Sequence, residues 1–522
     1  MGQGSQPQYR VAVHKDVPFQ TRDGVTLRAD VYRPDAEGRF PVLLTRLPYD
    51  KNSRQRDAID YFVERGYVMV GQDTRGRFAS DGNEYYPLIW EAQDGYDAVE
   101  WAAGLPWSDG NVGTIGQSYL GATQYLMLPT RPPHLKTAFP VSASADFHQS
   151  WVYHTGGAFE FGWQIPYAIL MARDSIARQG LTESLLPALE REITDPVIPF
   201  AQPLTEAACK RLPLTWWADL LEPVARYLGE YLRHPDDGPY WWAVNLERLL
   251  FNVDIPVFHV TSWYDIFLRG GLKAFCGLQE QAMGETARAN QKLLVGPWAH
   301  LFPYNSPTSR GTGDIDFGDN AKIELNETQL RWFDRWLKGI ETGITGEPPV
   351  KIFVMGENVW RDENEWPLAR TRYTPYYLHS QGGANSAVGD GTLTPSAPGE
   401  EAPDGYVYDP ADPVPTRGGN TLIIPIGVQD QRDVEARRDV LVYTGEPLSR
   451  PLEVTGPIVV KLFAASSAPD TDFTAKLVDV RPDGYARNLA DGIVRGRYRA
   501  SRTFPTPLQP GAVTEFTIDL WA

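Results

Sequence analysis

The sequence predicts an α/β domain with a parallel sheet, a helical insertion within that domain, and a β-sandwich domain after it. Three observations support this fold class. Short apolar runs alternate with helix-like segments before residue 145, a helical and aromatic stretch follows, and the last third of the chain is dense in short strands and turns. The chain has 522 residues, more than one hydrophobic core usually organises, so two or three domains are expected.

The first elements are a hairpin and a series of buried strands. Residues 11–34 alternate apolar and polar side chains around Asp23-Gly24, which is typical of a hairpin turn. Helical segments at 57–65 and 91–103 then alternate with apolar runs. Strands that are apolar on both faces and alternate with helices predict a parallel sheet covered on both sides. The apolar runs are 41–45, 67–72, 112–115 and 137–141.

Residues 145–245 interrupt this alternation with a helical pattern rich in Trp. Strand-like runs resume at 257–262 and 292–295, so we predict an insertion into the α/β domain. Sheets of this kind bind ligands at the carboxyl ends of their strands, where an insertion would roof the site. The predicted division is 1–144 and 246–345 for the α/β domain, 145–245 for the insertion and 346–522 for the sandwich.

The region after residue 345 carries strand candidates separated by Pro, Gly and Asp. Just before it, residues 323–337 place apolar side chains at helical spacing, and Gly339 is suited to end that helix. Many short strands without a convincing helix predict a β-sandwich. The candidates are 350–355, 374–379, 421–424, 440–443, 458–464, 474–480 and 515–520.

Composition narrows the classes of partner. The formal net charge of −17 argues against a nucleic-acid partner. Two cysteines without a Cys/His cluster predict neither a disulfide framework nor a thiolate metal site, and nothing calls for a cofactor. No apolar run approaches the ~20 residues of a membrane helix, and no leader is evident at the N-terminus, so a soluble cytoplasmic protein is expected.

One segment carries a nucleophile signature. Residues 112–125 read V-G-T-I-G-Q-S-Y-L-G-A-T-Q-Y, a strand, a sharp turn and a helix with Ser118 at the turn. Such a turn exposes the serine hydroxyl beside backbone N–H groups that can stabilise an oxyanion. The second glycine, Gly121, follows the serine by three residues instead of two. The alternative interpretation is a solvated or helix-capping serine.

The order of later residues favours catalysis. A serine hydroxyl needs a histidine to take its proton and a carboxylate to orient that histidine. Asp265 follows the run at 257–262, and His300 follows the run at 292–295. Of the eight histidines, His300 alone directly follows a buried strand late in the α/β domain. Its alternative interpretation is a loop histidine bonded to backbone.

Seven motifs make the sequence similar to the cocaine esterase family. That family includes α-amino acid ester hydrolases, glutaryl cephalosporin acylases and X-prolyl dipeptidyl-peptidases. The resemblance implies an α/β-hydrolase fold with a helical cap and a carboxyl-terminal jelly-roll domain. The motifs are D-G-V-x-L-x-A-D-V-Y-R-P from Asp23, L-P-Y at Tyr49, D-x-R-G from Asp73, D-G-Y-D from Asp94, G-x-S-Y-x-G at Ser118, W-Y-D at Asp265 and G-P-W-x-H at His300.

The resemblance also implies roles for site residues. Ser118 would be the nucleophile, His300 the general base and then acid, and Asp265 the orienting carboxylate. The oxyanion would be held by the Tyr119 backbone N–H and the Tyr49 phenol. The alternative for Tyr49 is a buried phenol with a structural hydrogen bond.

Aromatic residues are candidates for an apolar acyl pocket, and each could instead belong to the core. They are Trp151, Phe159, Trp163 and Phe267. Asp73, Arg75, Asp94 and Asp97 are expected to form a structural polar network beneath the site. The segment 313–318 is expected to be a turn, with a cation or amine site as its alternative.

Three functions remain open. The first is hydrolysis of carboxylic esters through an acyl-enzyme, with a small-molecule substrate. The second uses the same triad on amides, as an acylase or X-prolyl peptidase would, with Glu160 as a lone candidate for binding an amine. The third is a non-catalytic binding protein. An edge strand of the sandwich could serve a homodimer interface.

Overall fold

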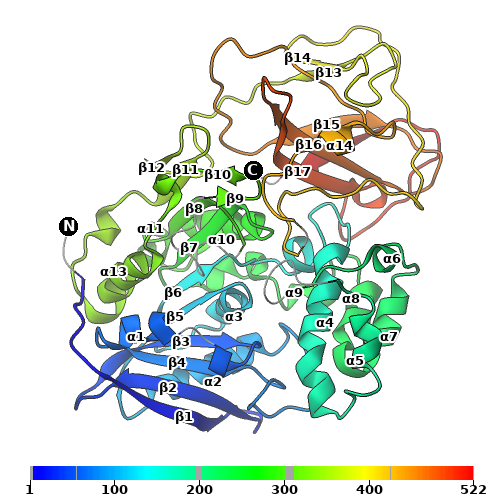
Figure 1. The fold of residues 1–522 in the computed structure, drawn as a ribbon. Coiled ribbons are helices and arrows are strands. Elements are labelled where there is room, and N and C mark those ends of the chain that lie inside the picture. Colours follow the sequence, from blue (N-terminus) through cyan, green and yellow to red (C-terminus); the bar gives the residue numbers. More distant parts are fainter. Residues whose placement is uncertain (1–3, 54–55, 195–201, 301–310, 424, 521–522) are drawn as a thin grey trace.

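The computed structural model describes residues 4–53, 56–194, 202–300, 311–423 and 425–520. A ten-stranded sheet forms the α/β region, and its strand order is β1-β2-β4-β3-β5-β6-β7-β8-β11-β12 (Figure 1). The central strands from β4 to β11 are parallel, and the pairs at both edges are antiparallel. The predicted parallel sheet is therefore confirmed.

The strands of this sheet match most of the predicted apolar runs. The predicted hairpin forms from the first two strands, with Gly24 at φ 85° in its turn. The strands are β1 (Val11–Gln20), β2 (Thr26–Pro34), β3 (Phe40–Leu47), β4 (Val68–Asp73), β5 (Ser108–Gln117), β6 (Leu135–Val141), β7 (Phe258–Tyr264), β8 (Lys292–Ala299), β11 (Val350–Val354) and β12 (Val359–Glu363).

Helices cover both faces of the sheet. The helices α1 (Arg56–Val63) and α13 (Leu325–Lys338) pack on one face, through Phe62 and Phe333. The other face carries α2 (Glu91–Ala103), α3 (Tyr119–Met127), α10 (Leu268–Gln281) and α11 (Glu285–Ala289). Gly339 ends α13 at φ 70°, as predicted.

Among the described residues, six helices that follow β6 and precede β7 in the sequence lie together beside the sheet (Figure 1). Their buried side chains form an aromatic cluster that includes Trp163, Trp217 and Trp241, and Tyr119 and Phe267 of the α/β region belong to it. The helices are α4 (Phe161–Arg178), α5 (Leu186–Glu190), α6 (Glu206–Cys209), α7 (Thr215–Ala225), α8 (Tyr227–Arg233) and α9 (Pro239–Trp242).

The C-terminal region is rich in β structure, but its strands differ from the prediction. The predicted strand at 350–355 was placed in the wrong sheet, because β11 pairs in parallel with β8 and extends the large sheet. An apolar run has the same pattern in either sheet, so the sequence does not distinguish them. The remaining elements are β9 (Gly311–Thr312), β10 (Ile315–Asp316), β13 (Tyr377–His379), β14 (Thr392–Thr394), α14 (Arg432–Glu435), β15 (Val459–Ala464), β16 (Asp472–Val480), β17 (Ala486–Arg495) and β18 (Thr514–Asp519).

Two further strand predictions were wrong, and the strands β12, β14 and β17 were not predicted. Residues 421–423 and 440–443 form no strand, although Leu441 makes an isolated bridge with Asn385; residue 424 lies outside the described residues. The strand β17 has alternating burial but contains Asn, Asp and Gly, which have low strand propensity and hid it.

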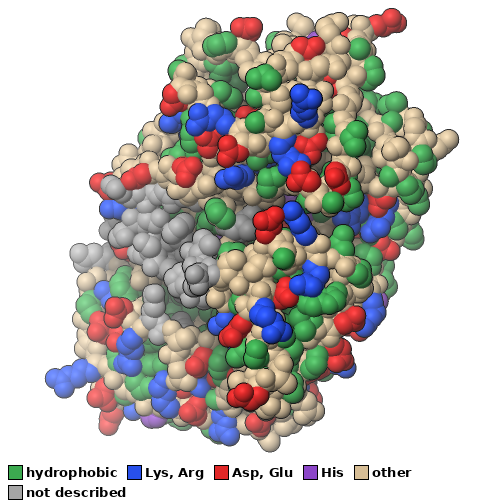
Figure 2. Space-filling model, turned by 45° about the vertical axis from the view of Figure 1, so that its right-hand side comes forward, with side chains coloured by type: hydrophobic (Ala, Val, Ile, Leu, Met, Phe, Trp, Pro, Cys, Tyr) green, Lys and Arg blue, Asp and Glu red, His purple; other side chains and the backbone are tan. Residues whose placement is uncertain are grey.

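The C-terminal region contacts both other parts of the chain. The N–H of Arg495 on β17 donates to the carbonyl of Gly156 at 2.9 Å, and the Tyr264 hydroxyl donates to the Asn488 carbonyl at 3.1 Å. On the face shown in Figure 2, acidic and basic side chains are interspersed. Within the described ranges, no helix is long and apolar enough to cross a membrane.

Candidate active site

Ser118 lies on a strained turn between β5 and α3. Its φ of 61° and ψ of −125° lie where side-chain-bearing residues are rare. The Ser118 N–H donates to the Val141 carbonyl at 2.9 Å, and its side chain makes no helix-capping bond, which removes the capping interpretation. The hydroxyl is therefore left free of the helix it precedes.

Packing explains the unusual glycine spacing. A Cβ on Gly121 would lie 2.6 Å from the Ala143 Cβ, and one on Gly116 would lie 2.4 Å from the Leu120 Cβ. The close approach of α3 to the end of β6 thus requires glycine three residues after Ser118.

Asp265 and His300 follow neighbouring strands. The register pairs Tyr264 with Ala299, so the next residue on each strand projects from the same sheet edge. The His300 Nδ1 lies 3.0 Å from the Asp265 Oδ1, and both side chains are buried. This bond orients the ring and leaves Nε2 for proton transfer. The His300 ring therefore bonds to a carboxylate, which differs from the alternative interpretation of a loop histidine bonded to backbone.

Hydrogen bonds between side chains and backbone hold this pair, and one of them joins it to the serine turn. The Gln117 side-chain amide donates to the His300 carbonyl, which joins the histidine to the residue before Ser118. The Phe267 N–H donates to Asp265 Oδ1 at 2.8 Å, and the Asn420 amide donates to the Asp265 carbonyl at 3.2 Å. The C-terminal region thus helps to hold the backbone of Asp265.

Tyr49 lies close to Ser118 and to helix α4. Its hydroxyl lies 3.0 Å from the Tyr167 hydroxyl on α4, and the nearby Ser118 side chain acts to lower the pKa of Tyr49. Burial raises the pKa of Tyr49 to about 12, so the phenol keeps its proton at neutral pH. It is placed to donate to an oxygen held beside Ser118.

Tyr119 offers its backbone to the site. Its N–H is the first of α3 and has no acceptor within that helix. Its side chain points into the core, where the hydroxyl donates to Glu91 Oε1 at 2.9 Å and accepts from the Leu88 N–H at 2.9 Å.

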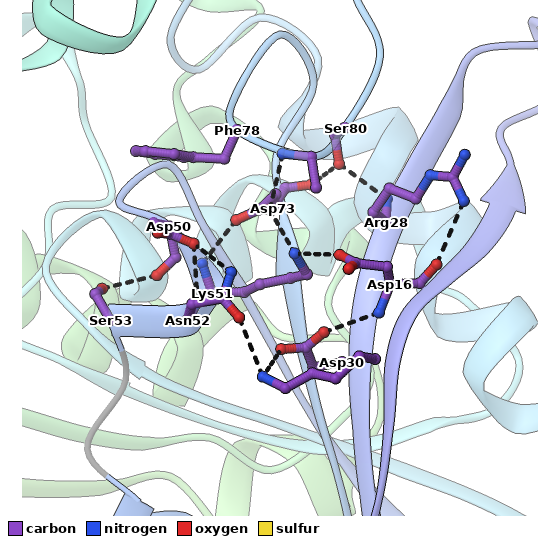
Figure 3. A network of polar contacts seen from close by, with 12 residues as sticks. Asp16, Arg28, Asp30, Asp50, Lys51, Asn52, Ser53, Asp73, Phe78 and Ser80 are labelled. Carbon is purple, nitrogen blue, oxygen red and sulfur yellow. Dashed lines mark hydrogen bonds and ion pairs between the residues drawn. The ribbon is translucent and has the colours of Figure 1, made fainter.

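Buried ion pairs hold the loop that carries Tyr49 (Figure 3). Lys51 is 1% exposed, and its ammonium lies 3.2 Å from Asp73 Oδ2 and 2.7 Å from Asp16 Oδ1. Asp73 Oδ1 also accepts the Lys51 N–H at 2.7 Å. Both ends of Lys51 are therefore fixed two residues from Tyr49.

Arg77 ties the same loop to helix α4. Its guanidinium donates to the Pro48 carbonyl at 2.8 Å and to the Met171 carbonyl at 2.7 Å. The residue before Tyr49 and the helix that carries Tyr167 therefore share one buried cation.

The predicted polar network is present as separate clusters. Arg75 pairs with buried Asp94 at 2.6 Å and with Asp23 at 2.8 Å, while Asp73 pairs with Lys51. Asp97 pairs with Arg22, whose side chain is half exposed. These contacts support the structural role that was expected.

Three of the four predicted pocket aromatics meet beside His300. Trp151 stacks on Phe267 at 4.3 Å between ring centres, Trp163 contacts Phe267 edge-on at 5.9 Å, and Phe267 contacts the His300 ring at 5.1 Å. Phe159 packs on Tyr153 at the margin of this stack.

Two other predicted candidates have structural partners. Glu160 is partly buried, and burial, with the nearby charge of Asp491, raises its pKa to about 8, so it is not a fully solvated charge. Residues 313–318 form the turn of a short hairpin, and Asp314 accepts bonds from Gln429 and Tyr485. In the part of the chain that the structure describes, no group of three or more His, Cys, Asp or Glu residues could hold a metal ion.

Comparison with known proteins places the chain in a family. A model described as X-Pro dipeptidyl-peptidase (S15 family) matches residues 23–302, and one described as the X-Pro dipeptidyl-peptidase C-terminal non-catalytic domain matches residues 342–522. The chain belongs to the S15 family. The S15 match spans the residues from Tyr49 to His300 that line the site.

Proteins similar to this chain include named esterases. Cocaine esterase of Rhodococcus sp. (strain MB1 Bresler) is 40% identical, covering 98% of this chain and 88% of its own. A putative serine esterase of Mycobacterium bovis is 26% identical over the same shares. A solved α-amino acid ester hydrolase has a TM-score of 0.72 at 26% identity, covering 98% of this chain and 86% of that one. These matches confirm the predicted family.

Several residues around the candidate site carried no sequence signal. Tyr167, Lys51, Arg77 and Asn420 reach the site from a helix and from loops, so only tertiary contacts reveal them. Gln117 adjoins the nucleophile in the motif, and its position alone could have marked it.

Proposed function

We propose that this chain is a serine hydrolase that cleaves carboxylic esters through an acyl-enzyme on Ser118. The observation that carries the proposal is the arrangement around the serine turn. The Ser118 side chain lies near the Tyr49 phenol, and the bonded pair of Asp265 and His300 is joined to the same turn through Gln117.

In the first half-reaction, the Ser118 Oγ attacks the ester carbonyl and its proton passes to His300 Nε2. The Asp265 carboxylate stabilises the resulting imidazolium. The tetrahedral intermediate then expels the alcohol, which takes the proton from His300. In the second half-reaction, water gives a proton to His300 and attacks the acyl-enzyme, and Ser118 recovers its proton as the acid leaves.

Negative charge on the carbonyl oxygen would be stabilised by two donors, the Tyr49 hydroxyl and the Tyr119 N–H. Both are supported by their geometry, because the phenol is protonated beside Ser118 and the N–H heads a helix. Such donors act most strongly where water is excluded.

The acyl group would lie against the aromatic stack of Trp151, Trp163 and Phe267, with Phe159 at its margin. In this proposal the helices α4–α9 act as a cap over the site, and the C-terminal region is a jelly roll that buttresses both. The expected homodimer remains a prediction, which light scattering at micromolar concentration tests; a strict monomer would contradict it.

Hydrolysis of p-nitrophenyl butyrate and of an X-Pro p-nitroanilide, measured in parallel, tests the proposal. We expect ester turnover to exceed anilide turnover by orders of magnitude and to disappear in Ser118→Ala. Ester turnover that survives in a well-folded Ser118→Ala variant would contradict it.

One observation favours a second candidate, cleavage of amides or esters whose acyl part bears an amine. Glu160 and Asp491 bring two carboxyl groups near each other between the helical segment and the C-terminal region. A bound protonated amine would favour the ionised form of Glu160 and so be attracted to the two carboxyl groups. Faster turnover of an aminoacyl ester than of the matched ester without the amine, lost in Glu160→Gln, would support this candidate.

A further inference from the structure

Tyr167 is a second phenol at the candidate oxyanion site. It lies on α4, four residues after Trp163, and is 8% exposed. Its hydroxyl lies 3.0 Å from the Tyr49 hydroxyl, and the two rings meet edge-on with centres 6.4 Å apart. The chain separates these residues by 118 positions, so the helical segment supplies this contact.

Because a phenol hydroxyl carries one proton, only one of the two tyrosines can donate in the Tyr167–Tyr49 hydrogen bond during catalysis. A phenol has one proton to donate and lone pairs that accept. In the proposed mechanism Tyr49 gives its only proton to the oxyanion. Its oxygen can then only accept, so the proton between the two phenols must come from Tyr167.

We propose that Tyr167 is a positioning residue for ester hydrolysis, which donates a hydrogen bond to Tyr49 and so aims and strengthens the Tyr49 O–H toward the oxyanion. The inference rests on the proposed function. Bonds in such a chain polarise one another, so the donor at its end becomes stronger.

The surroundings hold the two phenols in this relation. Trp163 contacts the Tyr167 ring at 5.3 Å between ring centres, and Arg77 binds backbone next to Tyr49 and on α4. Burial raises the pKa of Tyr49, whereas the bond from Tyr167 and the charge of Arg77 act to lower it. Burial also raises the pKa of Tyr167 well above its ordinary value, so this phenol stays protonated.

A matched control is available in the same aromatic cluster. Tyr227 on α8 is 2% exposed, and its hydroxyl has no hydrogen-bond partner among the described residues. Tyr227→Phe therefore removes a buried phenol hydroxyl without touching Tyr49.

A double-mutant cycle on p-nitrophenyl butyrate tests the proposal. Tyr167→Phe is expected to lower kcat about 5- to 30-fold with KM nearly unchanged, and Tyr49→Phe about 10²–10³-fold. The double variant should match Tyr49→Phe within about 2-fold, because Tyr167 acts through Tyr49. Tyr227→Phe should keep the wild-type kcat.

Phenylboronic acid gives a second readout, since its tetrahedral adduct with Ser118 places an oxygen in the oxyanion site. We expect its inhibition constant to rise in Tyr167→Phe by about the factor lost in kcat. Additive losses, or a change in KM alone, would overturn the inference while the proposed function stands. A wild-type protein without Ser118-dependent ester turnover would overturn both.

Discussion

The two sides of Ser118 are built in different ways. On the side where we propose proton transfer, Asp265 and His300 follow adjacent strands, and the sheet register brings them together. On the side where we propose the oxyanion, Tyr49 comes from a loop whose position depends on Lys51 and on contacts with α4. The comparison teaches that one side is fixed by backbone pairing and the other by a side-chain network.

The largest expected effect lies on the proton side. Asp265→Asn should lower kcat for p-nitrophenyl butyrate about 10⁴-fold, because the amide favours the wrong tautomer of His300. Steady-state assays of the purified variant measure kcat, and an unchanged circular dichroism spectrum shows that the variant is folded. A loss of less than 10-fold would mean that the pair is only structural.

Tyr49→Phe is the matching change on the oxyanion side. We expect kcat to fall about 10²–10³-fold, since one of two oxyanion donors is lost. Activity should remain measurable because the nucleophile and base are intact. Full activity in a folded variant would assign Tyr49 a structural role.

Lys51→Met tests whether the side-chain network positions Tyr49. It leaves the buried Asp73 carboxylate without its cation, so the free energy of unfolding should fall by about 3 kcal/mol and kcat by about 10-fold. Urea denaturation and steady-state kinetics measure the two effects.

Asp16→Asn is the control for this change, because it removes only the exposed partner of Lys51. It should alter stability by less than about 1 kcal/mol and leave kcat near the wild-type value. Equal kinetic losses in both variants would show that the Lys51–Asp73 pair has no special part in positioning Tyr49.

The smallest expected effect concerns a carboxyl group beside the site. Burial raises the Glu160 pKa from 4.5 to about 8, so the folded protein keeps a proton that the unfolded chain releases. This stabilising contribution is fully present below pH 4.5 and is lost as pH rises through 8. Glu160→Gln should therefore raise Tm relative to wild type by about 2 °C more at pH 9 than at pH 5. Calorimetry measures both Tm values. A Tm difference between variant and wild type that is equal at pH 5 and pH 9 would argue against the raised pKa of Glu160.

The sequence predicts the Asp265–His300 side of Ser118 better than the Tyr49 side. The parallel sheet and the order of Ser118, Asp265 and His300 could be predicted, because apolar periodicity marks each strand and its end. The support of Tyr49 by Tyr167 could not, since a tyrosine in a helix has the same pattern whether it packs in a core or meets a second phenol.

The C-terminal region shows a second limit. The strand β17 was missed because its burial alternates through Asn, Asp and Gly, and β11 was assigned to the wrong sheet because pairing partners are chosen by tertiary contacts. Strand propensity therefore predicted that the C-terminal region is rich in β structure, but it did not predict which strands pair with one another.

Intact-mass spectrometry after incubation with a serine-directed fluorophosphonate tests the central proposal, that Ser118 is an activated nucleophile. We expect one adduct on the wild-type protein and none on Ser118→Ala. An unlabelled wild-type protein that is well folded, or labelling that persists in Ser118→Ala, would contradict the proposal.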